Sequence, residues 1–222
     1  MYRPRGVANL KDVGRWRYIV LIAIGIAGTV YIWQHWRQWR LGAAGAQSNG
    51  SAGLSGGGIA PERFVWRTVN RPADGFRAEM PGSPEAGEVE DSGGDASTGQ
   101  VHMLTSHPGP ATSYSISWAD DPPVVESGGQ SAEQVLTTAR DGALARTQTM
   151  LVGETPTSVQ GFPAEDFTAR NAEGGIFDAR LILQGKRLYM LTAAFPSESA
   201  RRQDIVAAFF EDFRLTAPAA AQ

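Results

Sequence analysis

The side chains that could act as bases or metal ligands are few and scattered along this chain. Two histidines, His102 and His107, stand five residues apart in a run that alternates apolar and polar residues. They could join a carboxylate around a metal ion, but no third ligand stands at a spacing typical of a zinc site. We therefore interpret both as histidines that face solvent or lie in a loop, and His35 as a residue near a membrane interface.

Carboxylates are the second group of candidates, because hard cations prefer oxygen ligands. The chain offers two acidic clusters, which comprise Asp120, Asp121 and Glu126, and Glu85, Glu88, Glu90, Asp91 and Asp95. Neither cluster follows the spacing of a calcium-binding loop. We interpret them as solvated acidic surface and predict no metal site.

One serine, Ser55, stands in the G-x-S-x-G pattern of hydrolases, but that pattern needs a strand before it and a helix after it. Its neighbours are Gly, Ala and Ser without periodicity, so the match is accidental. The chain has no cysteine, which excludes disulfides, thiolate catalysis and cysteine-ligated metal centres. No glycine-rich phosphate loop lies between a predicted strand and a predicted helix. We predict no catalytic residue and no cofactor, and hence not an enzyme.

Charge is distributed unevenly along the chain. The first 40 residues hold seven Lys or Arg residues and one acid, about +6, whereas the whole chain carries −3. The remainder therefore carries about −9. Binding to nucleic-acid phosphates depends on Lys and Arg, so this acidic remainder argues against a nucleic-acid partner.

An apolar run from Tyr18 to Trp33 contains no charged residue. A spanning helix needs about 20 apolar residues, and aromatic and Arg side chains at both ends extend this run, since they settle at or reach the headgroup level. We predict a transmembrane helix over residues 17–40. Its anchoring residues are Trp16, Arg17, Tyr18, Tyr31, Trp33, Trp36, Arg37, Trp39 and Arg40.

Orientation follows from the basic residues, five of which precede the apolar run while two follow it closely. Because cytoplasmic flanks carry the excess of Lys and Arg, we predict that residues 1–16 form a cytoplasmic tail at the inner (cytoplasmic) membrane. The rest of the chain is then periplasmic. A cleaved signal peptide is the alternative, since Ala44-Gly45-Ala46 resembles a cleavage site, but Arg37 and Arg40 separate it from the apolar run.

Composition changes twice after the predicted helix. Residues 41–61 are Gly, Ala and Ser without charge, which predicts a flexible linker with a root-mean-square reach of about 25 Å. Residues 62–216 then alternate short apolar and polar runs with turn residues, as half-buried strands do. We predict one extracytoplasmic domain over 62–216, followed by a short tail over 217–222.

Strands are predicted at "ERFVWRTVN", "GFRAEM", "QVHMLTS", "TSYSISWA", "SVQGFPAEDFTARN", "GGIFDARLILQG" and "KRLYMLTAAF", the last two joined as a hairpin at Gln184-Gly185-Lys186. Residues 83–100 are predicted to be an acidic loop, which Pro81-Gly82-Ser83-Pro84 opens by ending a strand.

Two helices complete the domain. Ser131 with Gln134 forms a capping box before the first of them, in which Val135, Leu136, Ala139, Ala143 and Leu144 share one face. The second helix is predicted from Ser197 to Phe213, with an apolar stripe of Ile205, Val206, Phe209, Phe210 and Phe213. Hairpin connections dominate this order, so the fold class is α+β, an antiparallel sheet covered by helices and preceded by one transmembrane helix.

Several of these segments together resemble the PsbP-like superfamily, over about residues 62–215. They are "GFRAEMPGSP", "YSISWADDP", "VQGFPAEDFTAR", "RLILQGKRLYMLTAAFP" and "AAFFEDFRL". Pro81, Gly82 and Pro84 match the family's strand-ending string, whereas Met80 replaces its usual phenylalanine. Asp212 stands where the family often has serine. The resemblance implies an α/β/α sandwich without a catalytic site.

The resemblance further implies an accessory subunit or assembly factor of a larger envelope membrane complex, with a photosynthetic or respiratory complex as an extension. Its partners would be integral membrane subunits. An acidic domain could also steer a basic soluble electron carrier. Two alternatives stay open: an extracytoplasmic ligand-binding or chaperone-like module, and a hydrolase.

Overall fold

A computed structural model describes residues 65–89, 101–109, 111–120 and 130–216. The predicted membrane helix at 17–40 and the linker at 41–61 lie outside these residues. Within the described parts, no helix combines the length and the apolar character that crossing a bilayer requires.

Seven antiparallel strands form the main sheet, in the order β3-β4-β5-β9-β8-β7-β6. Their bounds are β3 (Glu85–Val89), β4 (Val101–Gly109), β5 (Thr112–Asp120), β6 (Thr149–Val159), β7 (Phe162–Asn171), β8 (Ile176–Gln184) and β9 (Arg187–Phe195). Each neighbouring pair is consecutive in the sequence except β5 and β9, so hairpins build both halves of the sheet. The predicted antiparallel sheet is confirmed.

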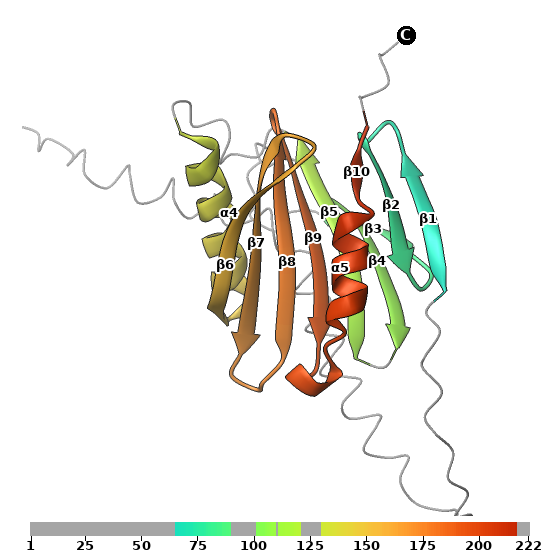
Figure 1. The fold of residues 1–222 in the computed structure, drawn as a ribbon, viewed down its shortest axis with the longest axis vertical. Coiled ribbons are helices and arrows are strands. Elements are labelled where there is room, and N and C mark those ends of the chain that lie inside the picture. Colours follow the sequence, from blue (N-terminus) through green and yellow to red (C-terminus); the bar gives the residue numbers. More distant parts are fainter. Residues whose placement is uncertain (1–64, 90–100, 110, 121–129, 217–222) are drawn as a thin grey trace, which may run out of the picture.

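A second, three-stranded sheet pairs β1 (Trp66–Arg71) and β10 (Arg214–Leu215) with the two sides of β2 (Phe76–Pro81). Figure 1 shows this small sheet beside helix α5 (Gln203–Glu211), both on one face of the main sheet, while helix α4 (Ala132–Thr147) lies on the other face. The single predicted sheet is thus wrong in one respect, because β1 and β2 leave it to form a separate layer.

Helix α4 begins as the sequence predicts. The Ser131 hydroxyl accepts a hydrogen bond from the Gln134 N–H, and the Gln134 side chain accepts one from the Ser131 N–H. These two bonds satisfy donors that a helix start otherwise leaves unpaired. Val135, Leu136 and Ala143 are buried against the sheet, and α4 lies over β6, β7 and β8.

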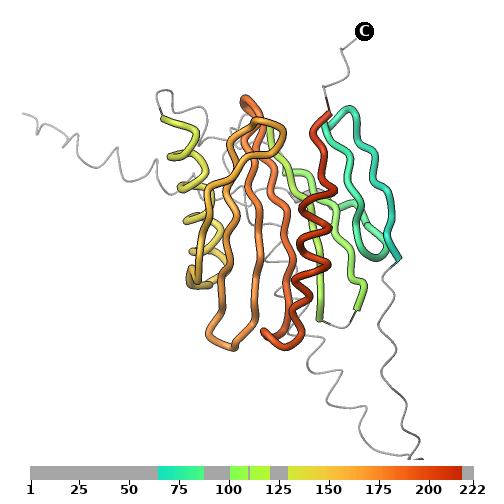
Figure 2. The backbone as a smooth tube through the Cα atoms, viewed as in Figure 1, coloured from blue at the N-terminus to red at the C-terminus, as the bar shows by residue number. Residues whose placement is uncertain are grey.

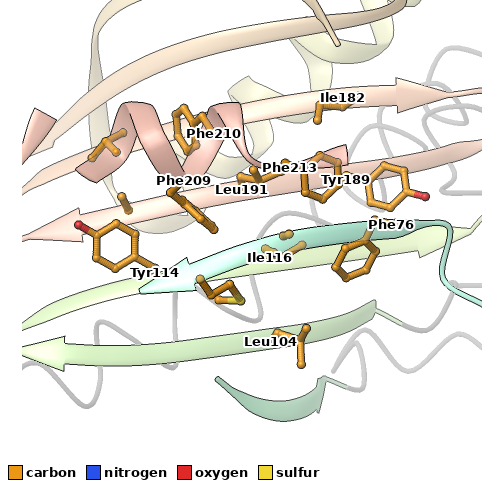
Figure 3. Packing of buried hydrophobic residues seen from close by; sticks show 14 of the residues in the cluster. Phe76, Leu104, Tyr114, Ile116, Ile182, Tyr189, Leu191, Phe209, Phe210 and Phe213 are labelled. Carbon is orange, nitrogen blue, oxygen red and sulfur yellow. The ribbon is translucent and has the colours of Figure 1, made fainter. Parts of the chain in front are cut away.

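The opposite face of the sheet holds the larger aromatic core, which Figure 3 shows from close by. Phe209 of α5 meets Tyr114 of β5 edge to face, with ring centroids 5.5 Å apart. Phe76 of β2 contacts both Trp118 and Phe213, at 5.0 and 5.5 Å. These ring contacts join α5 and the small sheet into one layer over β4, β5 and β9.

Two strands differ from the predictions made from the sequence. Residues 85–89 form β3 instead of acidic loop, because they complete the edge beside β4. The strand predicted at residues 158–171 comprises β7 and the last two residues of β6, joined by a two-residue turn, and the rest of β6 was not predicted. Gln160 and Gly161 occupy this turn with φ of 51° and 85°, a left-handed pair typical of tight hairpins.

The final helix is shorter than predicted. A 3-10 turn at η1 (Glu198–Ala200) and an extended Arg201 precede it, so α5 begins at Gln203. Phe213 lies beyond the helix end and is fully buried. The apolar stripe is confirmed as core, but its last member packs from the connection to β10.

The Pro81-Gly82-Ser83-Pro84 segment ends β2, as predicted. Gly82 has a φ of 87°, which favours glycine, and a side chain there would meet Pro108 at 3.2 Å. The Ser106 hydroxyl donates to the Pro81 carbonyl over 2.6 Å. The segment therefore fixes the small sheet to the end of β4.

The aromatic layer gives a first test. Phe209 is fully buried, so we expect Phe209→Ala to lower the free energy of unfolding by about 3–5 kcal/mol, since it removes buried area and leaves a cavity. Urea denaturation followed by tryptophan fluorescence measures the change. Val152→Ala, at an exposed position, is the control and should change stability by less than about 0.5 kcal/mol; equal losses in both variants would contradict the packing.

Candidate functional site

A cleft of about 510 Å³ lies between α5 and the outer strands of the main sheet. Strands β6, β7 and β8 form its floor, and α5 forms one wall. Its residues are Gly153, Glu154, Thr155, Asp166, Phe167, Thr168, Asp178, Ala179, Arg180, Arg201, Gln203, Val206, Ala207, Phe210 and Glu211. Polar and charged side chains therefore line this concave surface together with a few apolar ones.

Arg180 and Asp166 form the first ion pair of the floor. They are direct cross-strand partners on β8 and β7, and the Arg180 Nε and Nη2 atoms donate to the two carboxylate oxygens over 2.6 and 2.7 Å. Arg180 also donates from Nη1 to the Phe210 carbonyl over 3.1 Å, and its guanidinium lies 5.1 Å from the Phe210 ring. One side chain thus links two strands to the C-terminal end of α5, where a helix favours positive charge.

Arg201 and Asp178 form the second pair. Arg201 donates from Nε and Nη2 to the two Asp178 oxygens over 2.8 and 2.6 Å, and the Asp178 side chain is 5% exposed. The Thr168 hydroxyl donates to the same carboxylate over 2.7 Å. Arg201 reaches Glu198 as well. The buried Asp178 carboxylate, which accepts from Arg201 and Thr168, therefore holds the segment before α5 on the sheet.

A third cluster lies on the opposite face of the sheet, below α4. Arg140 pairs with Glu165 over 3.0 Å and also with Glu154 and Asp141. Burial raises the pKa of the Glu165 carboxyl above its usual range, although the Arg140 charge acts in the opposite direction. Arg140 thus links α4 to β6 and β7 by ion pairs. Arg201 links the residues before α5 to β8 in the same way.

These arrangements define what the cleft can do chemically. In both Arg–Asp pairs the guanidinium faces its carboxylate with two donors, the geometry in which such pairs are strongest. The Thr168 hydroxyl donates to Asp178 and accepts from Arg201, so its proton and one of its lone pairs are both engaged within this cluster. The cleft is accordingly a concave polar surface whose two arginines are held in place by paired carboxylates.

The residues that the sequence singled out lie elsewhere. His102 stacks on Trp118, its cross-strand partner, with ring centroids 5.4 Å apart. His107 lies near the other end of β4, about 16 Å along an extended strand, so the two histidines cannot share a metal ion. Among the described residues no three His, Asp or Glu side chains gather as metal ligands.

Asp120 is engaged in a structural role. Both of its carboxylate oxygens accept from Arg187, its cross-strand partner on β9, and this hydrogen bonding lowers the pKa of Asp120. Glu85 and Glu88 lie on β3. The remaining acids of the two clusters, namely Asp121, Glu126, Glu90, Asp91 and Asp95, lie outside the described residues, as do all nine predicted anchor residues from Trp16 to Arg40.

Sequence reasoning missed the cleft. The feature of the sequence that could have indicated it is the charged pair Asp178 and Arg180 in a strand, "IFDARLILQ", that is apolar elsewhere up to its last residue. Residues two apart on a strand share a face, so both side chains had to lie on the same side of the sheet. The partner of each charge, however, stands in another element, and nothing in the spacing identifies it.

No family model and no curated protein matches the sequence. The structure is similar to the solution structure of cyanobacterial PsbP (CyanoP) from Synechocystis sp. PCC 6803, with 16% identity and a TM-score of 0.48, over 72% of this chain and 97% of that chain. It is also similar to a crystal structure of a Pseudomonas aeruginosa protein of unknown function, with 12% identity and a TM-score of 0.32, over 61% of this chain and 85% of that chain.

The buried pair under α5 can be tested by removing one partner. We expect Arg201→Ala to lower the free energy of unfolding by about 3–5 kcal/mol, because it leaves Asp178 buried without its counter-charge. Arg170→Ala is the matched control, since Arg170 pairs with Glu198 on the surface, where both side chains are about half exposed; it should cost less than about 1 kcal/mol. Denaturation curves of both variants measure these changes. Similar losses in the free energy of unfolding would contradict a larger contribution from the buried Asp178 pair.

Glu165 supplies a test by pH. Its folded-state pKa is raised, so lowering the pH through that pKa adds a proton to the folded state first and stabilises it, until the pH falls below the unfolded pKa near 4.3. Glu165→Gln removes this titration. The stability of the native chain relative to this variant should therefore increase as the pH falls from 7 toward about 4.5, and urea denaturation at several pH values measures it. A difference that stays constant over this range would contradict the raised pKa.

Proposed function

We propose that this chain is a membrane-anchored accessory protein that binds and stabilises a larger complex of envelope membrane proteins and performs no catalysis of its own. The predicted helix at 17–40 would lie beside partner helices. The domain from residue 62 onward would contact the partner's periplasmic surface through its cleft and the sheet around it.

The observation that carries the proposal is the pairing inside the cleft. Arg180 and Arg201 are each held by a carboxylate with two hydrogen bonds, and both also fix α5 or the residues before it. A surface ordered in this way before binding loses little conformational freedom when a partner docks. That property suits a scaffold more than it suits a site that must take up and release protons.

The net negative charge of the domain supports the same proposal. The part of the chain after residue 40 carries about −9, and unpaired acidic surface attracts basic partners over a long range. A basic soluble electron carrier is therefore a second partner class, and it would extend the role to an energy-transducing complex. The salt dependence of association distinguishes this case, since steering of that kind weakens as ionic strength rises.

Extraction of the full chain in a mild detergent tests the proposal. We expect the chain to migrate on a native gel in a complex larger than its monomer, with the same membrane proteins recovered in repeated preparations. A variant in which an unrelated apolar helix replaces residues 17–40 should stay in the membrane but lose part of the complex, because it keeps the domain and loses the helix contacts. A chain recovered alone as a monomer would contradict the proposal.

The cleft has its own variant for this assay. Thr155 and Gly153 line the floor from the edge strand β6, and neither takes part in the two Arg–Asp pairs. We expect Thr155→Arg to reduce the fraction of chain in the complex by several-fold, since it adds bulk and positive charge to the docking surface without removing a buried contact. Ala145→Arg, at an exposed position of α4, is the matched control. Equal complex formation by the two variants would place the partner elsewhere.

A further inference from the structure

Four large hydrophobic side chains of the described residues are exposed to solvent. They are Val65, Met150, Leu151 and Val152, with exposed fractions of 59%, 70%, 38% and 59%. Single exposed apolar residues are common on protein surfaces, but three consecutive ones at the start of a strand are not. We call Met150, Leu151 and Val152 the apolar tip.

The apolar tip lies at a particular end of the molecule. Strand β1 begins at the lower end in Figures 1 and 2, and β6 begins at that same end, where α4 has just finished. Val65 stands directly before β1. Val65 and the apolar tip therefore lie at the same end of the molecule, on opposite edges of it in this view.

A partner strand does not explain the apolar tip. Strand β6 is the edge of the main sheet, but a β-bulge lies between Leu151 and Gly153, and Pro156 has no N–H to offer. Bulges and prolines are features by which edge strands prevent the addition of another strand. The apolar tip therefore offers a partner exposed side chains, and only a short stretch of backbone that could pair with another strand.

Positive charge accompanies these side chains. Arg170 is the cross-strand partner of Met150 and is 44% exposed, and Arg146 stands in the last turn of α4, four residues before Met150. Apolar side chains beside Arg are the combination that binds at the surface of a bilayer containing anionic lipids. Glu198 pairs with Arg170, so the attraction is partly offset and the apolar contact must supply the rest.

We propose that the apolar tip inserts into the interface of the bilayer that anchors the chain and so orients the domain on the membrane. This inference rests on the membrane anchor of the proposed function. The predicted linker at residues 41–61, with its root-mean-square reach of about 25 Å, would keep the domain close enough for its lower end to touch lipid. The turns at Gln160-Gly161 and Gly185-Lys186, at the other end of the sheet, then face away from the membrane.

The absence of cysteine makes the test direct, because each introduced cysteine is unique. The full chain carrying Val152→Cys or Lys186→Cys is labelled with an environment-sensitive fluorophore and reconstituted into vesicles of phosphatidylcholine with some phosphatidylglycerol. Lipids with a nitroxide in the acyl chain act as quenchers. We expect the label at residue 152 to shift to the blue and to be quenched several-fold more strongly than the label at residue 186.

A second variant keeps the result specific. Met150→Ser with Leu151→Ser in the Val152→Cys background should reduce the quenching several-fold, and its denaturation curve should match that of the parent because all three positions are exposed. Unchanged quenching would mean that the label alone enters the lipid, which overturns the proposal.

The remaining outcomes separate this inference from the function on which it rests. If the chain floats with the vesicles but the label at residue 152 stays in water, the anchor stands and lipid contact by the apolar tip is refuted, which leaves a protein partner for that surface. Equal quenching at residues 152 and 186 refutes the orientation. A chain that does not float with vesicles refutes the anchor and the inference together.

Discussion

The width of the main sheet is the constraint on which the rest of this structure depends. Seven strands about 4.8 Å apart span about 29 Å, whereas a helix with its side chains is about 10 Å across. Helix α5 runs along the strands (Figure 1), so its width allows it to cover little more than two of them. The small sheet β1-β2-β10 covers the β4 and β5 side of that face, and the strands on the other side of α5 are left to the cleft.

The side chains on β6, β7 and β8 follow from that shortage of cover. A strand face without apolar cover must carry groups that tolerate water, and here Asp166, Thr168 and Arg180 occupy it. Asp178 is the acid of this face that is buried. Its desolvation has to be offset by a counter-charge and hydrogen bonds, which Arg201 and Thr168 provide. Helix α5 is therefore held by apolar contacts on the side of the aromatic core and by Arg–Asp pairs on the side of the cleft.

Local signals in the sequence account for a large part of this fold. The capping box at Ser131 and the hairpin of β8 and β9 depend on residues close in the chain, and both were predictable. Strand β6 was not, because "TMLVGETPTSV" lacks alternation: nearly all of it is exposed on an edge, so no buried face imposes a period of two. Strand β3 was not predicted for a similar reason. Its acidic residues are typical of a loop, and only pairing with β4 makes them a strand.

The candidate site was beyond reach of the sequence for a different reason. Each ion pair joins residues well apart in the chain, such as Asp178 with Arg201, and an Arg offers no sign of which carboxylate it will meet. The same holds for Arg140, which stands one residue from Asp141 yet also binds Glu154 and Glu165 across two strands.

Both helices are held on their faces by an Arg–carboxylate cluster, and both clusters involve β7. Strand β7 therefore carries a buried or half-buried acid on each face, Glu165 toward α4 and Asp166 toward α5. That alternation couples the two layers through a single strand, so that a change in β7 would disturb the attachment of both helices at once.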